Sequence, residues 1–563
     1  MPENNNIVVH RPDGEHPFNL AMFKRLALAQ PHWVIDTETN GLEVLGHRAK
    51  HRAFWIGLMP KGSRHVFIFT REEFEDWDLR PIVEELRLIG HNLRFDLHAL
   101  NLRPHIGWTD TIAASYYRNT TTRHSMDHIA KVHGWPKIPT PDALKQGRIQ
   151  DVPEEELILY LADDCLTTNL MADTFFTVPC EEDYHVEAAV YRMERRGVRL
   201  LYDRLKDVGN TLIRRIMSSE VKLRQEGMIG NLNSSAQVAE WLTGMGRRLP
   251  YTPTGKPSTA KTALQKLSDD GDELAALLID WRKLIKLKTS FIEPLPNLAQ
   301  DGMLYPRTNT TRTATGRFSC DTPNLQQIPK RGPLGKAIRS CLTSGDEDGV
   351  TACDFSQVEL RVAAAFANEP VLLEAFNTGN CPHTEVAAKM LGKLTSEISP
   401  DERFKAKAVN FGILNGMGAK RLALELKTNK AEANRFLGEY RKNLPQLYSW
   451  MEGVWREAET YNLARTVAGR TRIFHGYEDT RPAISVIVQG SAAELMRKAL
   501  VAVDHAGLNP ILSVHDEILI GGTDNPEYLK EVMEDAANSA YPDAFSEIKF
   551  PATATTGETW GDV

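Results

Sequence analysis

Two apolar, strand-like segments that lie far apart in the chain both carry acidic residues, and they constrain the fold more than any other feature. The segment 350–355 reads VTACDF, and a helical pattern begins soon after Asp354. The segment 512–520 reads LSVHDEILI and places Asp516 at an expected tight turn between two strands. A buried acid at a turn is costly unless it is paired. We therefore expect both segments to join one sheet that brings Asp354 and Asp516 together.

Two carboxylates held together in this way can bind divalent cations. Asp354 and Asp516 would bridge two Mg²⁺ ions roughly 3.5–4 Å apart, one activating a 3′-hydroxyl and the other binding a triphosphate and its pyrophosphate leaving group. The protein would then contribute positioning and charge neutralisation.

The length and composition are those of an ordinary globular protein with several domains. At 563 residues the chain is too long for one hydrophobic core, and about three to four folding units are expected. A hydrophobic fraction of 42% and a charged fraction of 25% exclude a disordered or fibrous chain. The six cysteines form no CxxC pair, which disfavours a zinc site or a disulfide framework. No apolar run approaches the ~20 residues of a membrane span and the N-terminus lacks a signal-peptide pattern, so we expect a cytoplasmic protein.

The distribution of charge indicates a polyanionic partner, although the net charge is −7. A protein needs basic residues only where phosphates lie. Residues 302–340 contain one acid, Asp321, and seven basic residues: Arg307, Arg312, Arg317, Lys330, Arg331, Lys336 and Arg339. This locally basic track favours nucleic acid as the partner.

The pattern of apolar residues divides the chain into three parts. Residues 1–180 alternate strand-like runs at 32–38, 53–59 and 64–70 with a helical pattern at 71–88, which is typical of an α/β domain. Residues 184–300 are mostly helical. The remainder is an α+β region with long helical stretches between its strands.

The first part contains a second set of acids. Asp36 and Glu38 lie two residues apart on a strand and so project from one face, where they repel each other unless Mg²⁺ or Mn²⁺ binds. Tyr160 and Asp164 lie one helical turn apart, and Asp96 lies between the two pairs in the sequence. Taken singly, each acid is more often a solvated surface group. Together, the four acids and the tyrosine predict a two-metal phosphodiesterase in which Tyr160 orients the attacking water.

The helical stretch after residue 400 carries cations suited to a triphosphate. Arg403, Lys407 and Phe411 recur every four residues and so share one helix face. Alone, this pattern is more often a surface helix with one buried phenylalanine. Its combination with the acids of the sheet favours a nucleotide site.

These motifs resemble those of two known families. The spacing DxE, Nx₃D and Yx₃D over residues 33–171 resembles the tyrosine-bearing branch of the DEDD exonucleases. The segments 354–361, 403–412 and 514–517 resemble motifs A, B and C of the family A DNA polymerases, the bacterial DNA polymerase I group. Flanking segments at 313–319, 323–329 and 489–494 are similar to the same family, so the resemblance covers nearly the whole chain.

The resemblance implies a multidomain protein, in which an RNase H-like exonuclease domain precedes a right-hand polymerase domain. The expected boundaries are exonuclease 1–180, thumb 181–300, palm with motif A 301–370, fingers with motif B 371–476 and palm with motif C 477–563. The implied activity is primer extension with dNTPs, with 3′→5′ proofreading by the exonuclease. The role is replication or repair, and a phage-type replisome would suit such a chain.

The resemblance also implies roles for single residues. Asp354 and Asp516 bind metal with Glu517 beside them, and Asp36, Glu38, Asp96 and Asp164 bind metal in the exonuclease. The implied nucleotide contacts are Arg403, Lys407, Phe411, His383, Glu359, Gln357 and Asn415, with Lys407 also a proton donor to pyrophosphate and Glu359 selecting deoxyribose. The implied DNA contacts are Arg317, Asn324, Gln326, Gln489, Arg481 and His515, of which Arg317 and Gln489 would check minor-groove geometry.

The chain departs from the family pattern at several positions. Asn415 stands where motif B usually has a tyrosine, and Phe411 rather than tyrosine indicates discrimination against dideoxynucleotides. Ser485, Phe355 and Cys320 replace asparagine, tyrosine and serine. Because Asn415 removes an aromatic ring from the insertion site, we expect a roomier pocket with lower fidelity.

The implied partners are primer-template DNA, dNTPs and a single-stranded 3′ end, with no membrane. A monomer is expected, without a 5′ nuclease and with either low processivity or a separate processivity factor. Two other interpretations are an exonuclease whose C-terminal half only binds, and a DNA-binding scaffold. Both would tolerate loss of Asp354 or Asp516, yet these acids are present.

Overall fold

The computed structural model describes residues 7–13, 16–41, 43–46, 51–103, 107–175, 181–345, 348–476 and 479–563. The chain forms two compact units. The first comprises Met1–Gly197, Tyr305–Gln326 and Asp346–Thr556, and the second comprises Val198–Leu304, Gln327–Gly345 and Gly557–Val563. Each unit is therefore built from segments that are distant in sequence.

The N-terminal part of the first unit contains a six-stranded sheet in the order β1-β4-β3-β2-β5-β6. Its strands are β1 (Val8–His10), β2 (His32–Thr39), β3 (Ala53–Pro60), β4 (His65–Thr70), β5 (Arg87–Gly90) and β6 (Thr109–Asp110). β3 runs antiparallel to β2 and β4, whereas β5 runs parallel to β2 and to β6. The sheet is thus mixed, with β2 near its centre.

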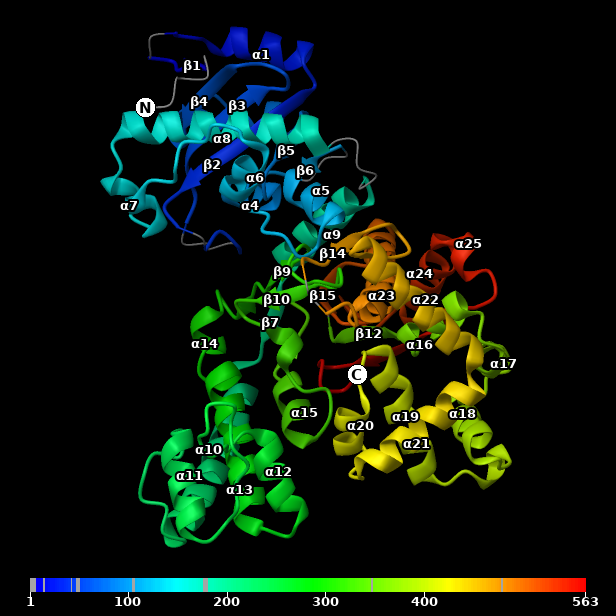
Figure 1. Ribbon diagram of the computed structural model, residues 1–563. Coiled ribbons are helices and arrows are strands. Elements are labelled where there is room, and N and C mark those ends of the chain that lie inside the picture. The colour runs from blue at the N-terminus through cyan, green and yellow to red at the C-terminus, as the bar shows by residue number, and fades with distance from the viewer. Residues whose placement is uncertain are drawn as a thin grey trace. The chain divides into compact units, whose positions relative to one another are not determined.

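Helices pack on this sheet and on one another and bury its apolar residues. They are α1 (Leu20–Ala29), α4 (Leu93–Leu100), α5 (Thr111–Arg118), α6 (Met126–His133), α7 (Asp142–Lys145) and α8 (Glu154–Phe175). The next helix, α9 (Glu181–Arg196), contacts α4 and α5. α8 packs against β2 and β3 and lies across the strands in Figure 1. Val34 on β2 and Leu161 on α8 are fully buried in one cluster. The α/β domain expected from the sequence is confirmed.

The prediction of helix over residues 71–88 is wrong in its length. The structure has two short helices, α2 (Arg71–Asp76) and α3 (Arg80–Glu84), and β5 begins at Arg87. Thr70 and Glu73 cap the start of α2 reciprocally. Asp78 then adopts φ 46°, a left-handed conformation that ends a helix, and Pro81 lies in the first turn of α3.

A four-stranded sheet in the order β15-β16-β12-β17 forms the second core of the first unit. Its strands are β12 (Val350–Phe355), β15 (Pro510–Val514), β16 (Glu517–Gly521) and β17 (Ala552–Gly557). β16 runs antiparallel to both β12 and β15. Helices α16 (Val358–Ala367), α23 (Ala483–His505) and α24 (Pro526–Ala540) belong to the same core. The expectation that the two distant acid-bearing segments share one sheet is confirmed.

The chain between β12 and α23 is mostly helical. Its helices after α16 are α17 (Pro370–Asn377), α18 (Pro382–Leu391), α19 (Pro400–Leu414), α20 (Ala419–Glu425), α21 (Lys430–Asn443) and α22 (Pro445–Tyr461). α19 starts where Ser399 and Glu402 form a capping box and Pro400 takes the first position. The hairpin β13 (Leu463–Arg465) and β14 (Thr471–Ile473) follows, and the remaining elements of this unit are β9 (Arg307–Asn309), β10 (Ser319–Asp321) and α25 (Pro542–Phe545).

The second unit is mainly helical, as expected. It contains β7 (Val198–Leu200), α10 (Tyr202–Gln225), α11 (Ser235–Gly244), α12 (Lys261–Asp269), α13 (Glu273–Leu287), α14 (Leu295–Leu298), β8 (Met303–Leu304), α15 (Pro333–Arg339) and β11 (Leu342–Thr343). α10 packs along α13 (Figure 1). Between these helices, Trp281 donates to Glu220 Oε1 at 3.0 Å. No helix in the described part of either unit is long and apolar enough to cross a membrane.

Candidate functional site

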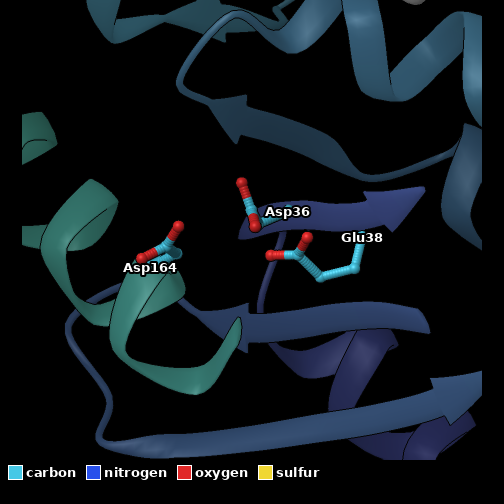
Figure 2. Close-up of side chains that lie close together, drawn as sticks. All are labelled: Asp36, Glu38 and Asp164. Carbon is cyan, nitrogen blue, oxygen red and sulfur yellow. The ribbon is translucent and has the colours of Figure 1, made fainter. Parts of the chain in front are cut away.

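Three acidic side chains of the N-terminal domain point toward one another. Asp36 and Glu38 extend from β2, and Asp164 extends from α8 (Figure 2). One carboxylate oxygen from each lies within 4.8 Å of the others. The strand spacing of two and the position of α8 across β2 produce this cluster, as the sequence pattern predicts.

Glu38 and Asp164 are buried and Asp36 is partly buried, so the negative charges of the cluster are costly. Burial followed by repulsion from Asp164, Asp96 and Glu38 raises the pKa of Asp36 well above its usual value. Burial and the charges of Asp164 and Asp96 raise the pKa of Glu38 to about 8. Burial also raises the pKa of Asp164 to about 6, although Lys137 acts against it. The fold therefore holds the acids together at an electrostatic cost.

Asp96 lies beside the three-acid cluster. Its Oδ1 accepts a hydrogen bond of 2.6 Å from the Thr37 hydroxyl, and burial raises its pKa to about 8. The group of mutually close oxygens comprises the other three acids. The direct role of Asp96 as a metal ligand remains a prediction.

Lys137 is a member of this site that the sequence did not indicate. Its ammonium forms ion pairs with Asp164 and, at 3.3 Å, with Asp163. It also lies 4.4 Å from the centre of the Tyr160 ring, and the Tyr160 hydroxyl is 3.2 Å from Thr140 Oγ1. The side chain of Lys137 is 7% exposed, so its positive charge acts at close range on Asp163 and Asp164 of α8.

The donor set fits a hard divalent cation. All three close ligand atoms are carboxylate oxygens, the type that Mg²⁺, Mn²⁺ and Ca²⁺ prefer. Their raised pKa values show that the single ammonium of Lys137 does not neutralise the cluster. A bound cation would relieve this repulsion.

The metal-free protein is expected to lose stability as the pH rises from about 6 to about 8. The unfolded acids titrate near pH 4, whereas Glu38 and Asp96 titrate at about 8 in the fold and Asp164 at about 6. Over this range the folded state binds more protons, so stability falls as the acids ionise. Melting curves in chelator should show a falling Tm, and Mg²⁺ should raise Tm more at pH 8 than at pH 6. Glu38→Gln should flatten the pH slope, and a Tm independent of pH in wild type would contradict this reading.

Asp354 and Asp516 belong to the four-stranded sheet and to the turn before β16, respectively. Asp354 near the end of β12 pairs with Glu517, the first residue of β16. His515 takes φ 58° in the turn, and the Phe355 N–H donates to the carbonyl of Asp516 at 3.1 Å. The turn between β15 and β16 therefore brings Asp516 next to the end of β12. The backbone places the two residues side by side, and their shared role as metal ligands stays a prediction.

Arg317 and Glu359 lie beside these acids. The Arg317 guanidinium forms an ion pair with Glu359 on α16. Burial lowers the pKa of Arg317, and the charge of Asp516 acts in the opposite direction. Glu359, which the resemblance assigns to sugar selection, is thus adjacent to a residue assigned to DNA.

The residues assigned to the triphosphate lie on α18 and α19. The His383 ring lies 5.7 Å from the Phe411 ring and accepts at Nδ1 a 2.9 Å hydrogen bond from Asn410 Nδ2. Burial, then Lys407 and Arg403, lowers the pKa of His383 to about 4. His383 is therefore neutral at pH 7, with its ring proton on Nε2.

Asn415 makes two side-chain hydrogen bonds at the C-terminus of α19. Its Nδ2 donates to the carbonyl of Phe411 at 2.8 Å, and its Oδ1 accepts from Gln489 Nε2 on α23 at 2.6 Å. Where the sequence suggested a roomier insertion site, the side-chain amides of Asn415 and Gln489 bond to each other. Asn415 links the helix of motif B to a predicted DNA contact.

The other residues assigned to DNA differ in their surroundings. Gln326 Nε2 donates to the carbonyl of Ser513 at 3.0 Å, whereas Arg481 is largely exposed and pairs with Asp479 at 2.6 Å. His515 is exposed in the β15–β16 turn. Asn324, also assigned to DNA, has a buried Oδ1 without a hydrogen-bond partner among the described residues. Gln357, which is assigned to the nucleotide, precedes α16 with φ 55°.

A buried ionic network lies in the part of the first unit that contains the four-stranded sheet. The sequence did not indicate this network. Arg470 donates to Asp183 at 2.8 Å and to Glu494 at 2.8 Å, and Arg497 donates to Asp183 at 2.9 Å. All four side chains are at most 5% exposed. Burial alone would raise the pKa of Asp183, but the two guanidinium groups lower it overall. The network ties α9 to the loop of the β13–β14 hairpin and to α23.

Comparison with known proteins agrees with both halves of this description. A family model for "3′-5′ exonuclease" matches residues 16–175, and a model for "DNA polymerase family A" matches residues 202–562. The solved POL domain of Pol1 from M. smegmatis, in complex with DNA primer-template and dNTP, has a TM-score of 0.82 at 23% identity. That comparison covers 98% of this chain and all of the other, and it shows that the two share a fold.

Curated relatives are bacterial polymerases. The thermostable DNA polymerase I of Thermus filiformis is 36% identical over 391 residues, which cover 65% of this chain and 46% of the relative. DNA polymerase I of Borreliella burgdorferi is 27% identical over 572 residues, covering 94% and 62%. The chain spans about half the length of the curated relatives that it matches. Because the polymerase model covers more than half of this chain, the chain belongs to family A of the DNA polymerases, with a 3′–5′ exonuclease domain at its N-terminal side.

Proposed function

We propose that the chain is a template-directed DNA polymerase that extends a primer 3′-hydroxyl with dNTPs and removes mismatched 3′ ends. The observation that carries the proposal is the pairing of β12 with β16, which sets Asp354 beside the Asp516 turn. Family membership supports the reaction type. The acid cluster on β2 and α8 supports the second activity.

In the proposed polymerisation site, Asp354 and Asp516 would hold Mg²⁺, which would supply activation of the primer hydroxyl and charge neutralisation of the triphosphate. Arg403 and Lys407 add fixed positive charge on one face of α19. His383, being neutral, offers an Nε2–H donor to a phosphate oxygen rather than a charge. By the family resemblance, Lys407 would also donate a proton to the departing pyrophosphate.

In the proposed exonuclease site, Asp36, Glu38 and Asp164 would hold divalent cations, which would supply the activation of the attacking water. Tyr160 orients the water, and the Lys137 ammonium over its ring together with Thr140 fixes the direction of its hydroxyl. Asp96 acts on the same acids through its charge.

We assign the parts of a polymerase to segments of the fold. The exonuclease is residues 1–180 and the fingers are residues 371–476. The sheet β15-β16-β12-β17 is the core of the palm. The thumb is residues 181–300, most of which lie in the helical second unit.

Lys137→Met is expected to strengthen binding of a divalent cation and to slow excision. The ammonium competes with a cation for Asp164, so its loss should raise Mn²⁺ affinity about tenfold or more. The same loss leaves Tyr160 and Asp164 less fixed, so the excision rate should fall. Mn²⁺ titration and degradation of a labelled strand measure the two effects. The exposed Lys131→Met is the control, and unchanged affinity in Lys137→Met would refute the competition.

Asn415→Tyr is expected to change the misinsertion frequency several-fold. The substitution removes the hydrogen bond that holds Gln489 Nε2 and adds an aromatic ring beside the insertion site. The error frequency should fall toward that of a polymerase with a filled pocket. Single-nucleotide insertion kinetics for matched and mismatched dNTPs give the ratio, with Asn429→Tyr at the cap of α21 as control. Equal ratios for wild type and Asn415→Tyr would show that this position does not govern accuracy.

The proposed function is tested by a primer whose last base is mismatched to its template. With Mg²⁺ and dNTPs, the protein should first shorten the primer and then extend it to full length. A protein that shortens the primer but never extends it would be an exonuclease alone. Extension without prior shortening would remove the proofreading part of the proposal.

A further inference from the structure

Residues 308–316 form a segment that runs from β9 to Arg317, the residue that the resemblance assigns to duplex DNA. The segment belongs to the same compact unit as the exonuclease domain. After β9 ends at Asn309 the backbone is irregular up to β10. The carbonyls of irregular backbone are not bound within a strand or a helix, so other groups must bind those that are buried.

Two hydroxyl groups at the C-terminal end of α5 bind consecutive carbonyls of this segment. The Tyr116 hydroxyl donates to the carbonyl of Thr313, and the Thr120 hydroxyl donates to the carbonyl of Ala314 at 2.9 Å. Tyr116 is fully buried and Thr120 is 7% exposed. The Thr120 N–H also donates to the carbonyl of Thr471 on β14 at 2.8 Å, so Thr120 is itself fixed in place.

A third residue of the exonuclease domain binds the start of the segment. Arg94 on α4 donates from Nη2 to the carbonyl of Thr308 at 2.6 Å. Glu194 on α9 accepts from the Thr308 N–H at 2.7 Å and lies 3.4 Å from Arg94. Both polar backbone groups of Thr308 are therefore bound by side chains from α4 and α9.

The segment is also held from α23. Arg497 Nη2 donates to the carbonyl of Gly316 at 3.1 Å and to the carbonyl of Thr310. Gly316 has φ 82°, a conformation that favours glycine, and a Cβ there would lie 3.3 Å from the Arg470 side chain. The backbone next to Arg317 therefore has little room to move.

The anchor at Thr313 connects directly to Arg317. The Thr313 hydroxyl donates to the carbonyl of Arg317 at 2.8 Å, while the Thr313 carbonyl accepts from Tyr116. Loss of the Tyr116 and Thr120 hydroxyls would leave two adjacent carbonyls unanchored, three and four residues before Arg317. A small displacement of a group that binds substrate can cost much of its contribution.

We propose that the exonuclease domain helps the polymerase to bind primer-template DNA, because Tyr116 and Thr120 position the segment that carries Arg317. This rests on the proposed function, from which Arg317 takes its role in DNA binding. Tyr116 and Thr120 act through the backbone of residues 313 and 314, so they are positioning residues. Their role is separate from the acids of the exonuclease site.

The test is the double variant Tyr116→Phe with Thr120→Val in the full chain. Each change removes a hydroxyl and nearly preserves the volume of the side chain. In extension assays the KM for primer-template should rise about tenfold, as expected for the loss of one or two hydrogen bonds, while kcat stays within about twofold. Excision of a single strand should keep its wild-type rate, which also reports that the exonuclease domain is folded.

Two comparisons separate positioning from a general loss of structure. Thr120→Ser keeps the hydroxyl, so its KM should stay within about twofold of wild type. In an Arg317→Met background the double variant should raise KM no further, because the residue through which it acts is gone. The matched control is Thr460→Val with Tyr461→Phe at the exposed end of α22, where the Thr460 hydroxyl donates to the carbonyl of Arg456 in its own helix. This control should leave KM unchanged.

Amide hydrogen exchange in the DNA-free protein gives a measurement that does not depend on polymerisation. Peptides that span residues 313–317 should exchange faster in the double variant than in wild type. If wild type extends primers and the double variant has the wild-type KM, the proposal is overturned. A rise in KM of equal size with and without Arg317 also overturns it. If wild type extends no primer, the proposed function fails instead, and faster exchange in the double variant would still support the anchoring of the segment.

Discussion

Replacing Asp516 with asparagine is expected to reduce primer extension on the order of 10³-fold or more while leaving excision at the wild-type rate. Asparagine keeps the size of the side chain and the turn between β15 and β16, but it removes the negative charge beside Asp354. Removing one preorganised donor from an active site already costs ~10²–10³-fold, and a charged metal ligand should cost more. Rapid-quench extension of a labelled primer gives the rate.

The matched control is Asp524→Asn, an exposed acid in the loop after β16. It changes the net charge equally, so its extension rate should stay within about twofold of wild type, as for a screened surface charge. If Asp516→Asn still extended primers at a rate near that of the control, the metal role of the β15–β16 turn would be wrong.

Arg470→Met is expected to destabilise the first unit by about 3–5 kcal/mol, because it removes the ion-pair partner of the buried Glu494 and one of the two partners of the buried Asp183. Asp183 and Glu494 each lose a 2.8 Å partner, and at most 5% of either side chain reaches water. Arg497 still pairs with Asp183, whereas among the described residues Glu494 keeps a hydrogen bond from the Thr466 hydroxyl, at 3.1 Å. Urea or thermal unfolding, monitored with a probe in the polymerase half, measures the loss in the free energy of unfolding.

The control for Arg470→Met is Arg441→Met, which breaks an exposed pair with Glu452 at 2.9 Å. Exposed pairs contribute about 0–1 kcal/mol, so this variant should unfold almost as wild type does. Equal stability of the two variants would mean that the buried network contributes no more than a surface pair.

The parts of the sites that the sequence predicted are those with short-range patterns or a shared motif. Asp36 and Glu38 alternate on a strand, and Tyr160 and Asp164 repeat at a helical turn, so their faces follow from periodicity. Asp354 and Asp516 were joined through strand pairing and motif resemblance, and β12 and β16 do pair.

The parts that the sequence could not predict depend on contacts across the fold. Lys137 lies in an irregular segment with no periodicity, and only folding brings it to Asp164. The hydrogen bond between Asn415 and Gln489 joins residues of two helices. The sequence assigned Asn415 to the nucleotide and Gln489 to DNA, and it did not indicate that they touch. The helix expected over 71–88 failed because apolar periodicity continues through Asp78, whose left-handed backbone breaks the helix.

The most direct test of the account is primer extension on four templates that differ only in the base opposite the first incorporated nucleotide. With Mg²⁺ and each dNTP in turn, the account predicts that only the complementary nucleotide is added to the primer on each template. The same primer, incubated with Mg²⁺ and no dNTP, should be shortened from its 3′ end. Addition of nucleotides without regard to the template, or no addition on any template, would contradict the assignment of Asp354 and Asp516 to a template-directed polymerase.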